Sequence, residues 1–227
     1  MNNVGNNYVK ESRMFRTIVF LIALVMVLTV TSKAEAKKGF YIGAGATYNT
    51  INGDFDGHSG LEGGTEVIIM PDINNAFGFD VLGGYGISDH WAIELNFMSS
   101  GHRGTWETFS GDVSYSSFSV NGKYSLATSG TVQPYLLFGV SYNGLMIKQG
   151  AADLFTGETG DATFTGPGLN FGTGVDIYVS PNLSLTPGVM FRYVDYTDAE
   201  GVHGSGSVSG GTDGSGFSLL LTTAYHF

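Results

Sequence analysis

The stretch LNFGTGVDIYVSPNLSLTPGVMFRY, residues 169–193, contains the pattern that decides the fold. Apolar residues recur at every second position on both sides of the polar turn SPN at 180–182, and glycine or polar residues occupy most positions between them. Successive side chains of a β-strand point to opposite faces, so this alternation predicts two antiparallel strands that each carry one apolar face.

The same two-residue alternation recurs in six further segments, which brings the predicted strands to eight. Each segment is about as long as a tilted strand that crosses a membrane. The six segments are 39–50, 76–87, 91–98, 117–126, 132–143 and 216–227.

The connections between the predicted strands alternate in length. Short turns are expected at 88–90, 127–131 and 180–182, whereas long polar loops are expected near 50–75, 99–112, 147–165 and 198–214. Outer-membrane barrels have this asymmetry, with short turns at one end and long loops at the other. The alternative is a soluble, lipocalin-like barrel whose apolar face points inward.

Two further features favour the membrane-embedded arrangement. The non-apolar face of the strands is mostly glycine and small polar residues, and aromatic residues fall near the strand ends, where interfacial girdles sit. A sheet in lipid must leave no edge, so segment 40–49 has to pair with 217–227. We therefore predict an all-β fold, a closed eight-stranded antiparallel transmembrane β-barrel.

The first 36 residues have the composition of a secretory signal peptide. A basic stretch with Lys10, Arg13 and Arg16 precedes the apolar run 17–31. After the run, Ala34-Glu35-Ala36 offers a small-x-small cleavage site. As a helix the run would rise only about 22 Å, short of the roughly 30 Å hydrocarbon core. The expected organisation is a cleaved signal peptide over 1–36, with Ala34 and Ala36 at the cleavage site, and a barrel domain over 37–227. Either Met1 or Met14 serves as the start.

Net charge and cysteine usage exclude several classes of function. The 227 residues carry a formal net charge of −10, and nucleic-acid binding depends on an excess of Lys and Arg, so no nucleic-acid partner is expected. The chain contains no cysteine, which excludes disulfides, thiolate nucleophiles and Cys-ligated zinc.

Strand parity places five ionisable side chains on the inward face, where each needs a partner in a narrow interior. We predict that Glu94 pairs with Lys123 and that Arg192 bonds to Asp80 or Asp176. Such a network could form a proton or ion path, but a structural plug is the favoured interpretation. The five residues are Asp80, Glu94, Lys123, Asp176 and Arg192.

The loops offer weaker signals for metal binding and catalysis. Asn52–Gly57 resembles the start of a calcium-binding EF-hand loop, but Glu62 stands one position before the bidentate glutamate of that motif. We interpret this stretch as an Asx-rich turn and assign no metal site and no cofactor. A weak divalent-cation site among the acidic outer loops is the alternative. His58, His102 and His203 fall in predicted outer loops without an evident orienting partner, so no enzymatic activity is expected.

The mature chain resembles the small eight-stranded OmpA/OmpX-type barrels of the bacterial outer-membrane β-barrel protein family. The resemblance is carried by GFYIGAGATY (39–48), ISDHWAIELNF (87–97), VQPYLLFGV (132–140), GVDIYVSPNLSL (174–185) and the terminal AYHF (224–227). It implies residence in the cell outer membrane of a Gram-negative-type bacterium, with both barrel ends of the chain on the periplasmic side. In this family the last strand is the signal read by the barrel-assembly machinery. The matching positions are Leu221, Thr223, Tyr225 and Phe227.

Architecture alone does not assign an activity. The expected role is non-enzymatic, either envelope-structural or surface interaction with an unidentified extracellular ligand through the loops. The alternative is a narrow porin-like channel for small or apolar solutes.

Overall fold

The computed structural model describes residues 38–63, 65–106 and 109–227. The predicted signal peptide and its cleavage site at Ala34 and Ala36 lie outside the described residues. Within the described part of the chain, no helix is long and apolar enough to cross a membrane.

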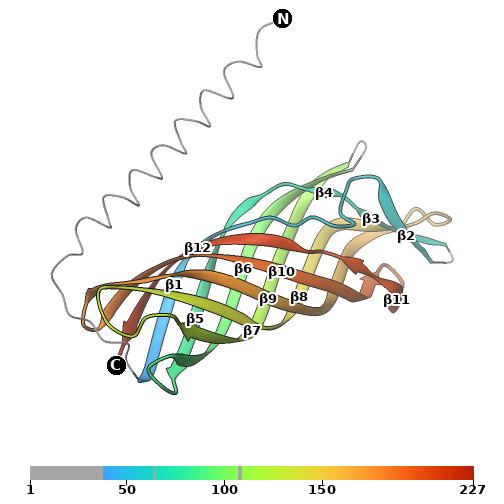
Figure 1. The fold of residues 1–227 in the computed structure, drawn as a ribbon. Helices are drawn as coiled ribbons and strands as arrows, with labels where there is room; N and C mark the ends of the chain where they lie inside the picture. Colours follow the sequence, from blue (N-terminus) through green and yellow to red (C-terminus); the bar gives the residue numbers. More distant parts are fainter. Residues whose placement is uncertain (1–37, 64, 107–108) are drawn as a thin grey trace, which may run out of the picture.

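Eight of the described strands form a closed antiparallel ring (Figure 1), as the sequence pattern predicted. The first and last strands of the ring complete it, with register from Tyr41 opposite His226 to Asn49 opposite Ser218. No edge is therefore left at the level of these strands. In ring order the strands are β1 (Gly39–Asn49), β5 (Ala76–Gly86), β6 (Trp91–Trp106), β7 (Phe109–Ser125), β8 (Val132–Asp153), β9 (Thr159–Ser180), β10 (Leu183–Gly201) and β12 (Gly216–His226).

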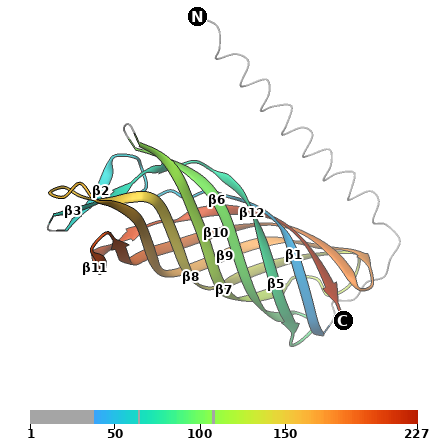
Figure 2. The same cartoon turned by 180° about the vertical axis from the view of Figure 1, so that it is seen from behind.

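The two ends of the barrel differ. At one end, here called the short-turn end, tight turns join β5 to β6, β7 to β8 and β9 to β10, and the C-terminus lies beside the start of β1 (Figure 2). The Phe227 amide donates a hydrogen bond of 3.0 Å to the Phe40 carbonyl there. The opposite end, the long-hairpin end, carries long β-hairpins.

The apolar side of each strand faces outward over the short-turn part of the barrel. Phe40, Phe77 and Val140 are 68%, 77% and 58% exposed, while Asn121 and Asp176 on the other parity are buried. The outward orientation predicted for the apolar stripes is confirmed, and the lipocalin-like alternative is wrong. A belt of this kind suits contact with lipid hydrocarbon.

The expectation that long polar loops fill these connections is largely wrong. β6 continues to Trp106, β8 to Asp153 and β10 to Gly201, so most of 99–112, 147–165 and 198–214 is strand. Backbone pairing simply continues beyond the apolar belt, where glycine and small polar residues do not interrupt it. Four short strands also form inside the predicted loops: β2 (Ser59–Gly63), β3 (Glu66–Met70), β4 (Asp72–Ile73) and β11 (Gly204–Asp213).

The segment between β1 and β5 folds over the long-hairpin end. β2 and β3 form a hairpin, β3 pairs with the end of β8, and β4 pairs with β6. These contacts position apolar side chains of the segment, among them Ile51, Phe55 and Ile73, in the barrel interior.

Candidate functional site

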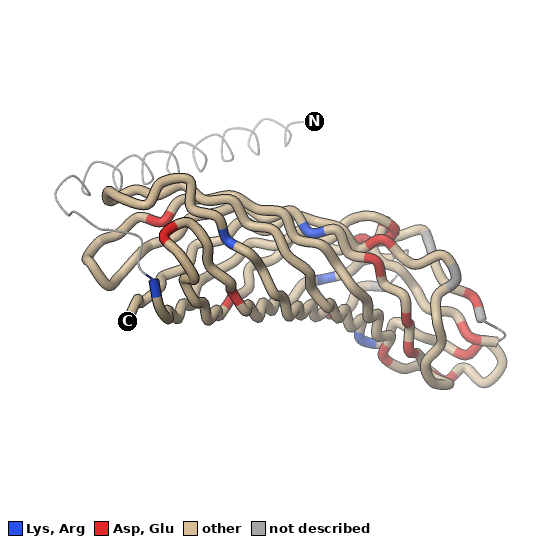
Figure 3. Tube along the Cα trace, turned by 60° about the horizontal axis from the view of Figure 1, so that its bottom comes forward, with Lys and Arg blue, Asp and Glu red and all other residues tan. Residues whose placement is uncertain are grey.

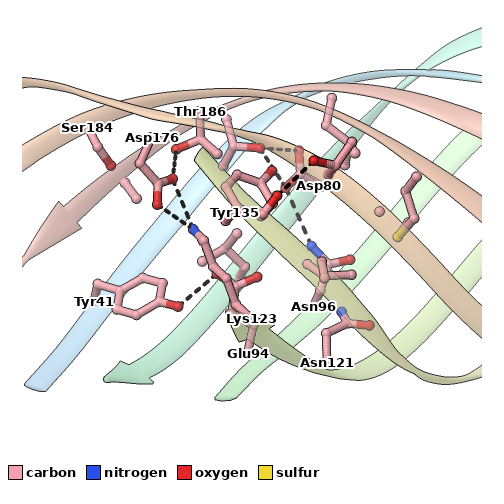
Figure 4. A pocket seen from close by; sticks show the side chains of 18 of the residues that line it. Tyr41, Asp80, Glu94, Asn96, Asn121, Lys123, Tyr135, Asp176, Ser184 and Thr186 are labelled. Atoms are coloured by element: carbon pink, nitrogen blue, oxygen red, sulfur yellow. Dashed lines mark hydrogen bonds and ion pairs between the residues drawn. The ribbon is translucent and has the colours of Figure 1, made fainter. Parts of the chain in front are cut away.

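The interior near the short-turn end contains a buried charge cluster centred on Lys123 (Figure 4). Its ammonium lies 2.9 Å from both carboxylate oxygens of Asp176 and 3.4 Å from Glu94 Oε1. The Tyr41 hydroxyl donates to Glu94 Oε1 at 2.7 Å, and the Thr186 hydroxyl donates to Asp176 Oδ1 at 2.8 Å. We call these five residues the lysine cluster. The structure thus brings together the predicted Glu94–Lys123 pair and adds Asp176 at a shorter distance.

Asp80 lies deeper along the barrel and is held by neutral donors. The Thr222 hydroxyl is 3.1 Å from its Oδ2 and the Asn96 amide nitrogen is 3.5 Å from the same oxygen. Within the described ranges, no Lys or Arg side chain is within ion-pair distance of Asp80.

The prediction that Arg192 bonds to Asp80 or Asp176 is wrong, because parity identifies a face of a strand and not a depth. Asp176 accepts from Thr186, six residues before Arg192 on β10, which is about 20 Å at the usual rise per strand residue. Asp80 accepts from Thr222, which is equally far from the β12 residue that pairs with Arg192.

Arg192 instead lies fully buried near the end of β1. Its Nη2 donates to the Thr50 carbonyl at 2.8 Å, and its Cζ lies 4.5 Å from the centre of the Tyr115 ring. The guanidinium is therefore held by a carbonyl and an aromatic face, a cation–π arrangement.

The interior towards the long-hairpin end is filled by an apolar cluster, which we call the apolar plug. Phe55, carried in by the segment after β1, packs edge-on against Phe164 and Tyr196, with ring centres 5.4 and 5.9 Å away. Sequence reasoning missed this plug because most of its members lie in or next to the predicted loops 50–75, 99–112, 147–165 and 198–214, although strands continue through much of the last three. Its members are Ile51, Phe55, Ile68, Met70, Ile73, Met98, Val113, Tyr115, Leu145, Ile147, Ala151, Ala162, Phe164, Met190, Val194, Tyr196 and Ala199.

A cavity of about 50 Å³ remains beside the lysine cluster and reaches from His226 near the short-turn end to Met190 of the apolar plug. All five members of the lysine cluster line it, and Leu82, Leu137, Val189 and Leu220 add apolar lining. Since one water needs roughly 10–15 Å³ by this measure, the space suits a few water molecules. It is far too small for an aqueous channel.

Side chains from three hairpins meet at a polar junction on the long-hairpin end. The Asp153 carboxylate lies 2.6 Å from His203 Nε2 and accepts the Thr65 hydroxyl at 2.8 Å. Glu66 accepts hydrogen bonds from the Val202 and His203 amides. We call Thr65, Glu66, Asp153 and His203 the hairpin junction. The expectation that His203 lacks an orienting partner is therefore wrong.

The hairpin junction shifts the acidity of both of its titrating groups. Hydrogen bonds from the Thr156 amide, from His203 and from Thr65 hold the pKa of Asp153 well below its usual range. The hydrogen bond to Asp153, aided by its charge and those of Glu66 and Glu158, raises the pKa of His203 above its ordinary value. Both shifts favour the ionised pair.

His102 also has partners that the sequence did not reveal. It lies on β6 and not in a loop, with Nε2 2.7 Å from the Ser100 hydroxyl and Nδ1 2.8 Å from the Asn74 carbonyl. A hydroxyl beside an oriented imidazole is the geometry of an activated nucleophile. Ser100 and His102 are only 5% and 4% exposed, however, and among the described residues a backbone carbonyl, that of Asn74, holds Nδ1 in place of a carboxylate.

The EF-hand-like stretch uses its carboxylates for backbone contacts. Asp54 Oδ2 accepts the Asp213 amide at 2.9 Å, and Asp56 Oδ1 accepts the His58 amide at 2.8 Å. Among the residues that the structure describes, no group of three His, Asp or Glu side chains is arranged to hold a metal ion.

The sequence matches the family model for the outer membrane protein beta-barrel domain over residues 20–227. The chain belongs to this outer-membrane β-barrel family. It therefore resides in the cell outer membrane, with its apolar belt in lipid. The short-turn end of such a barrel is periplasmic and the long-hairpin end extracellular.

Solved structures of other outer-membrane proteins share the fold at low sequence identity. Neisserial surface protein A is 20% identical with a TM-score of 0.57, over 87% of this chain and 100% of that one. OprG from Pseudomonas aeruginosa is 15% identical with a TM-score of 0.56, over 85% and 99%. A major outer membrane protein from Thermus thermophilus is 16% identical with a TM-score of 0.53, over 83% and 99%. No curated protein matches the chain.

In this outer-membrane barrel, the four positions that resemble the family's assembly signal lie on the lipid-facing side of β12 and of the residue that follows it. Leu221, Tyr225 and Phe227 are 50%, 47% and 66% exposed, and Thr223 is exposed beside them. The side chains of Ser218 and Thr222 on the other parity point into the interior.

Proposed function

We propose that this protein is a non-enzymatic outer-membrane scaffold that presents an ordered acidic surface to an extracellular partner. The observation that carries the proposal is a difference between the inside and the outer end of the barrel. The interior is filled at two levels, whereas the strands extend past the lipid and build the outer face. The lysine cluster and the apolar plug then act as structural fillings.

The filled interior argues against the alternative of a narrow porin-like channel. A solute would have to displace Lys123 from two carboxylates and then pass a cluster in which Leu145, Ile147 and Phe164 are 0% exposed. The remaining cavity of about 50 Å³ provides no continuous path.

Burial of the Ser100–His102 pair supports the absence of catalysis. A nucleophile must reach a reacting carbonyl or phosphoryl group, and both side chains are enclosed by the barrel wall and the segment before β5. The pair instead ties Asn74 to β6.

The extracellular tip of the β8–β9 hairpin supports a surface role. Leu154 and Phe155 are 70% and 84% exposed at this tip, beyond the apolar belt. Two neighbouring amides, of Phe155 and Thr156, donate hydrogen bonds to Asp153 Oδ1, and these bonds stabilise the turn at the tip. Large apolar side chains displayed to water on an ordered turn are typical of contact surfaces.

The route to the membrane follows from both ends of the chain. We propose export through the signal peptide over 1–36 and insertion by the barrel-assembly machinery through Leu221, Thr223, Tyr225 and Phe227. The intact mass of the protein extracted from outer membranes should correspond to a chain that begins at Lys37. A mass that includes the apolar run 17–31 would contradict cleavage.

A planar-bilayer recording tests the functional proposal. The refolded protein should give no reproducible single-channel steps in concentrated potassium chloride, with a refolded porin as the positive control. Cells that carry the protein on their surface should bind to immobilised matrix proteins. This binding should fall when Leu154 and Phe155 are both replaced by Ser. Regular conductance steps, with cell binding unchanged by the double substitution, would favour the channel.

A further inference from the structure

Beyond the lipid, the described part of the barrel wall is no longer a closed ring. One run of paired strands there is β2-β3-β8-β9-β10-β11, since β3 pairs with the end of β8 and β11 with the end of β10, and the ends of β4, β6 and β7 form a second run. Among the described residues, β2 pairs only with β3 and β11 only with β10. The outer edge of β2 and the outer edge of β11 before Asp213 are therefore unpaired at the extracellular end, while the Asp213 carbonyl accepts the Asp54 amide at 2.9 Å.

The two free edges border one groove. β2, β3 and β11 lie close together at this end of the molecule in both views (Figures 1 and 2). A groove of about 590 Å³ lies between them, with Leu61 and Glu62 of β2 on one side and Gly204–Val208 of β11 on the other. The contact of Glu66 with the Val202 and His203 amides joins β3 to the β10–β11 turn beside this groove.

The free edges lack two common forms of protection against strand addition. Edge strands in native proteins commonly carry Lys or Pro, which discourage pairing with another chain. β2 reads SGLEG and β11 reads GSGSVSGGTD, with neither Lys nor Pro, and β11 has no side chain larger than valine apart from its terminal Asp213. An approaching backbone meets little steric hindrance along β11.

The acidic side chains at the groove outnumber the basic ones. Glu62 and Glu66 line it together with His203, which is paired with Asp153, and Figure 3 shows acidic residues gathered at this end of the barrel with few basic ones. Leu61, Ile68, Ala199 and Val208 supply apolar contact in the same groove. An occupant that suits both properties alternates basic and apolar side chains.

We propose that the groove between β2 and β11 binds an extended basic segment of a partner protein by β-strand addition. The partner backbone would pair with a free edge, while its Lys or Arg side chains approach Glu62 and Glu66. This is the general mode in which main-chain hydrogen bonds supply affinity and side-chain contacts supply specificity. The inference rests on the proposed surface role and names the chemistry of the partner.

Fluorescence anisotropy with synthetic peptides tests this inference on the full mature chain, refolded in detergent micelles. The probe is a labelled peptide of four Lys-Val repeats. It should bind, whereas a peptide of four Glu-Val repeats and a Lys-Val peptide N-methylated at every second residue should bind at least tenfold more weakly. The N-methylated probe keeps the charge but cannot pair along one edge.

Matched substitutions locate the binding. Glu62→Lys should weaken the Lys-Val peptide at least tenfold, and Val208→Lys should do the same by protecting β11. Asp72→Lys makes the same charge change on β4, outside the groove, and should reduce binding less than threefold. Heat-dependent gel migration identifies variants that are folded.

Three results would overturn the inference. Equal binding of the N-methylated peptide would show charge attraction without strand pairing. Equal weakening by Glu62→Lys and Asp72→Lys would place the peptide elsewhere. A dimer in micelles that Val208→Lys converts to a monomer would assign the groove to a second copy of the chain. Each result is independent of the bilayer recording, so the surface role and its proposed partner can fail separately.

Discussion

The barrel interior is polar in its periplasmic half and apolar in its extracellular half. At the level of the lipid, Phe138 and Val140 of β8 face outward and Ser141 and Asn143 face inward. Further along the same strand Leu145 and Ile147 are buried inside, while Lys148 points outward near Asp112. The same alternate residues of the strand still point inward, but they are polar at the level of the lipid and apolar beyond it.

The cause of this inversion is the solvent outside the wall. Where the wall meets hydrocarbon, apolar side chains belong outside and the interior collects the polar groups, which then have to bond to one another. Where the wall meets water, apolar side chains are stabilised inside, as in a soluble barrel. The molecule is thus an outer-membrane barrel that continues as a water-soluble one.

The largest expected effect comes from breaking the polar half. Lys123→Met leaves Glu94 and Asp176 buried without their cation, and removing one partner of a buried ion pair costs about 3–5 kcal/mol. Urea unfolding in micelles should show a loss of that order. The triple variant that adds Glu94→Gln and Asp176→Asn should recover much of it. Unchanged stability of Lys123→Met would contradict the role of the cluster.

A smaller but comparable effect is expected in the apolar half. Leu145→Ala removes a fully buried side chain from the plug and should cost roughly 2–5 kcal/mol of unfolding free energy. Leu154→Ala is the matched control, because this leucine is 70% exposed at the hairpin tip and its loss should be nearly neutral. Equal effects of the two substitutions would mean that the plug is not packed.

Sequence alone predicted the half of the molecule that the membrane constrains. Alternation located the eight strands and the side that faces lipid, since hydrocarbon forces every second residue to be apolar. Alternation does not give depth along the barrel axis, and for this reason the predicted bond of Arg192 to Asp80 or Asp176 is wrong. Each carboxylate lies about six strand residues from the level of Arg192. The hairpin junction depends on contacts between hairpins distant in sequence, such as that of Asp153 with His203, which no local pattern encodes.

The smallest expected effect concerns the pH response of the hairpin junction. Because the pKa of His203 is raised, its contribution to the stability of the junction is complete below about pH 6.5, the ordinary pKa of histidine. That contribution is lost as the pH rises through the raised pKa. The lowered pKa of Asp153 means that its contribution is present above about 3.9 and is lost in stronger acid. The junction should therefore be tightest between about pH 4 and 6.5.

An NMR titration of the His203 ring in micelles checks this response. The midpoint should lie above 6.5, the ordinary value for His, and should fall towards it in Asp153→Asn. A midpoint that Asp153→Asn leaves unchanged would contradict the pairing.

Hydrogen exchange followed by mass spectrometry tests most directly whether the barrel continues beyond the lipid. In the refolded protein, amides of 145–147 and 162–165, which lie in the paired extracellular parts of β8 and β9, should exchange about as slowly as those of 136–142 within the apolar belt. Complete exchange of 145–147 and 162–165 within seconds, with 136–142 still protected, would show that only the membrane-level ring is ordered and would contradict the account.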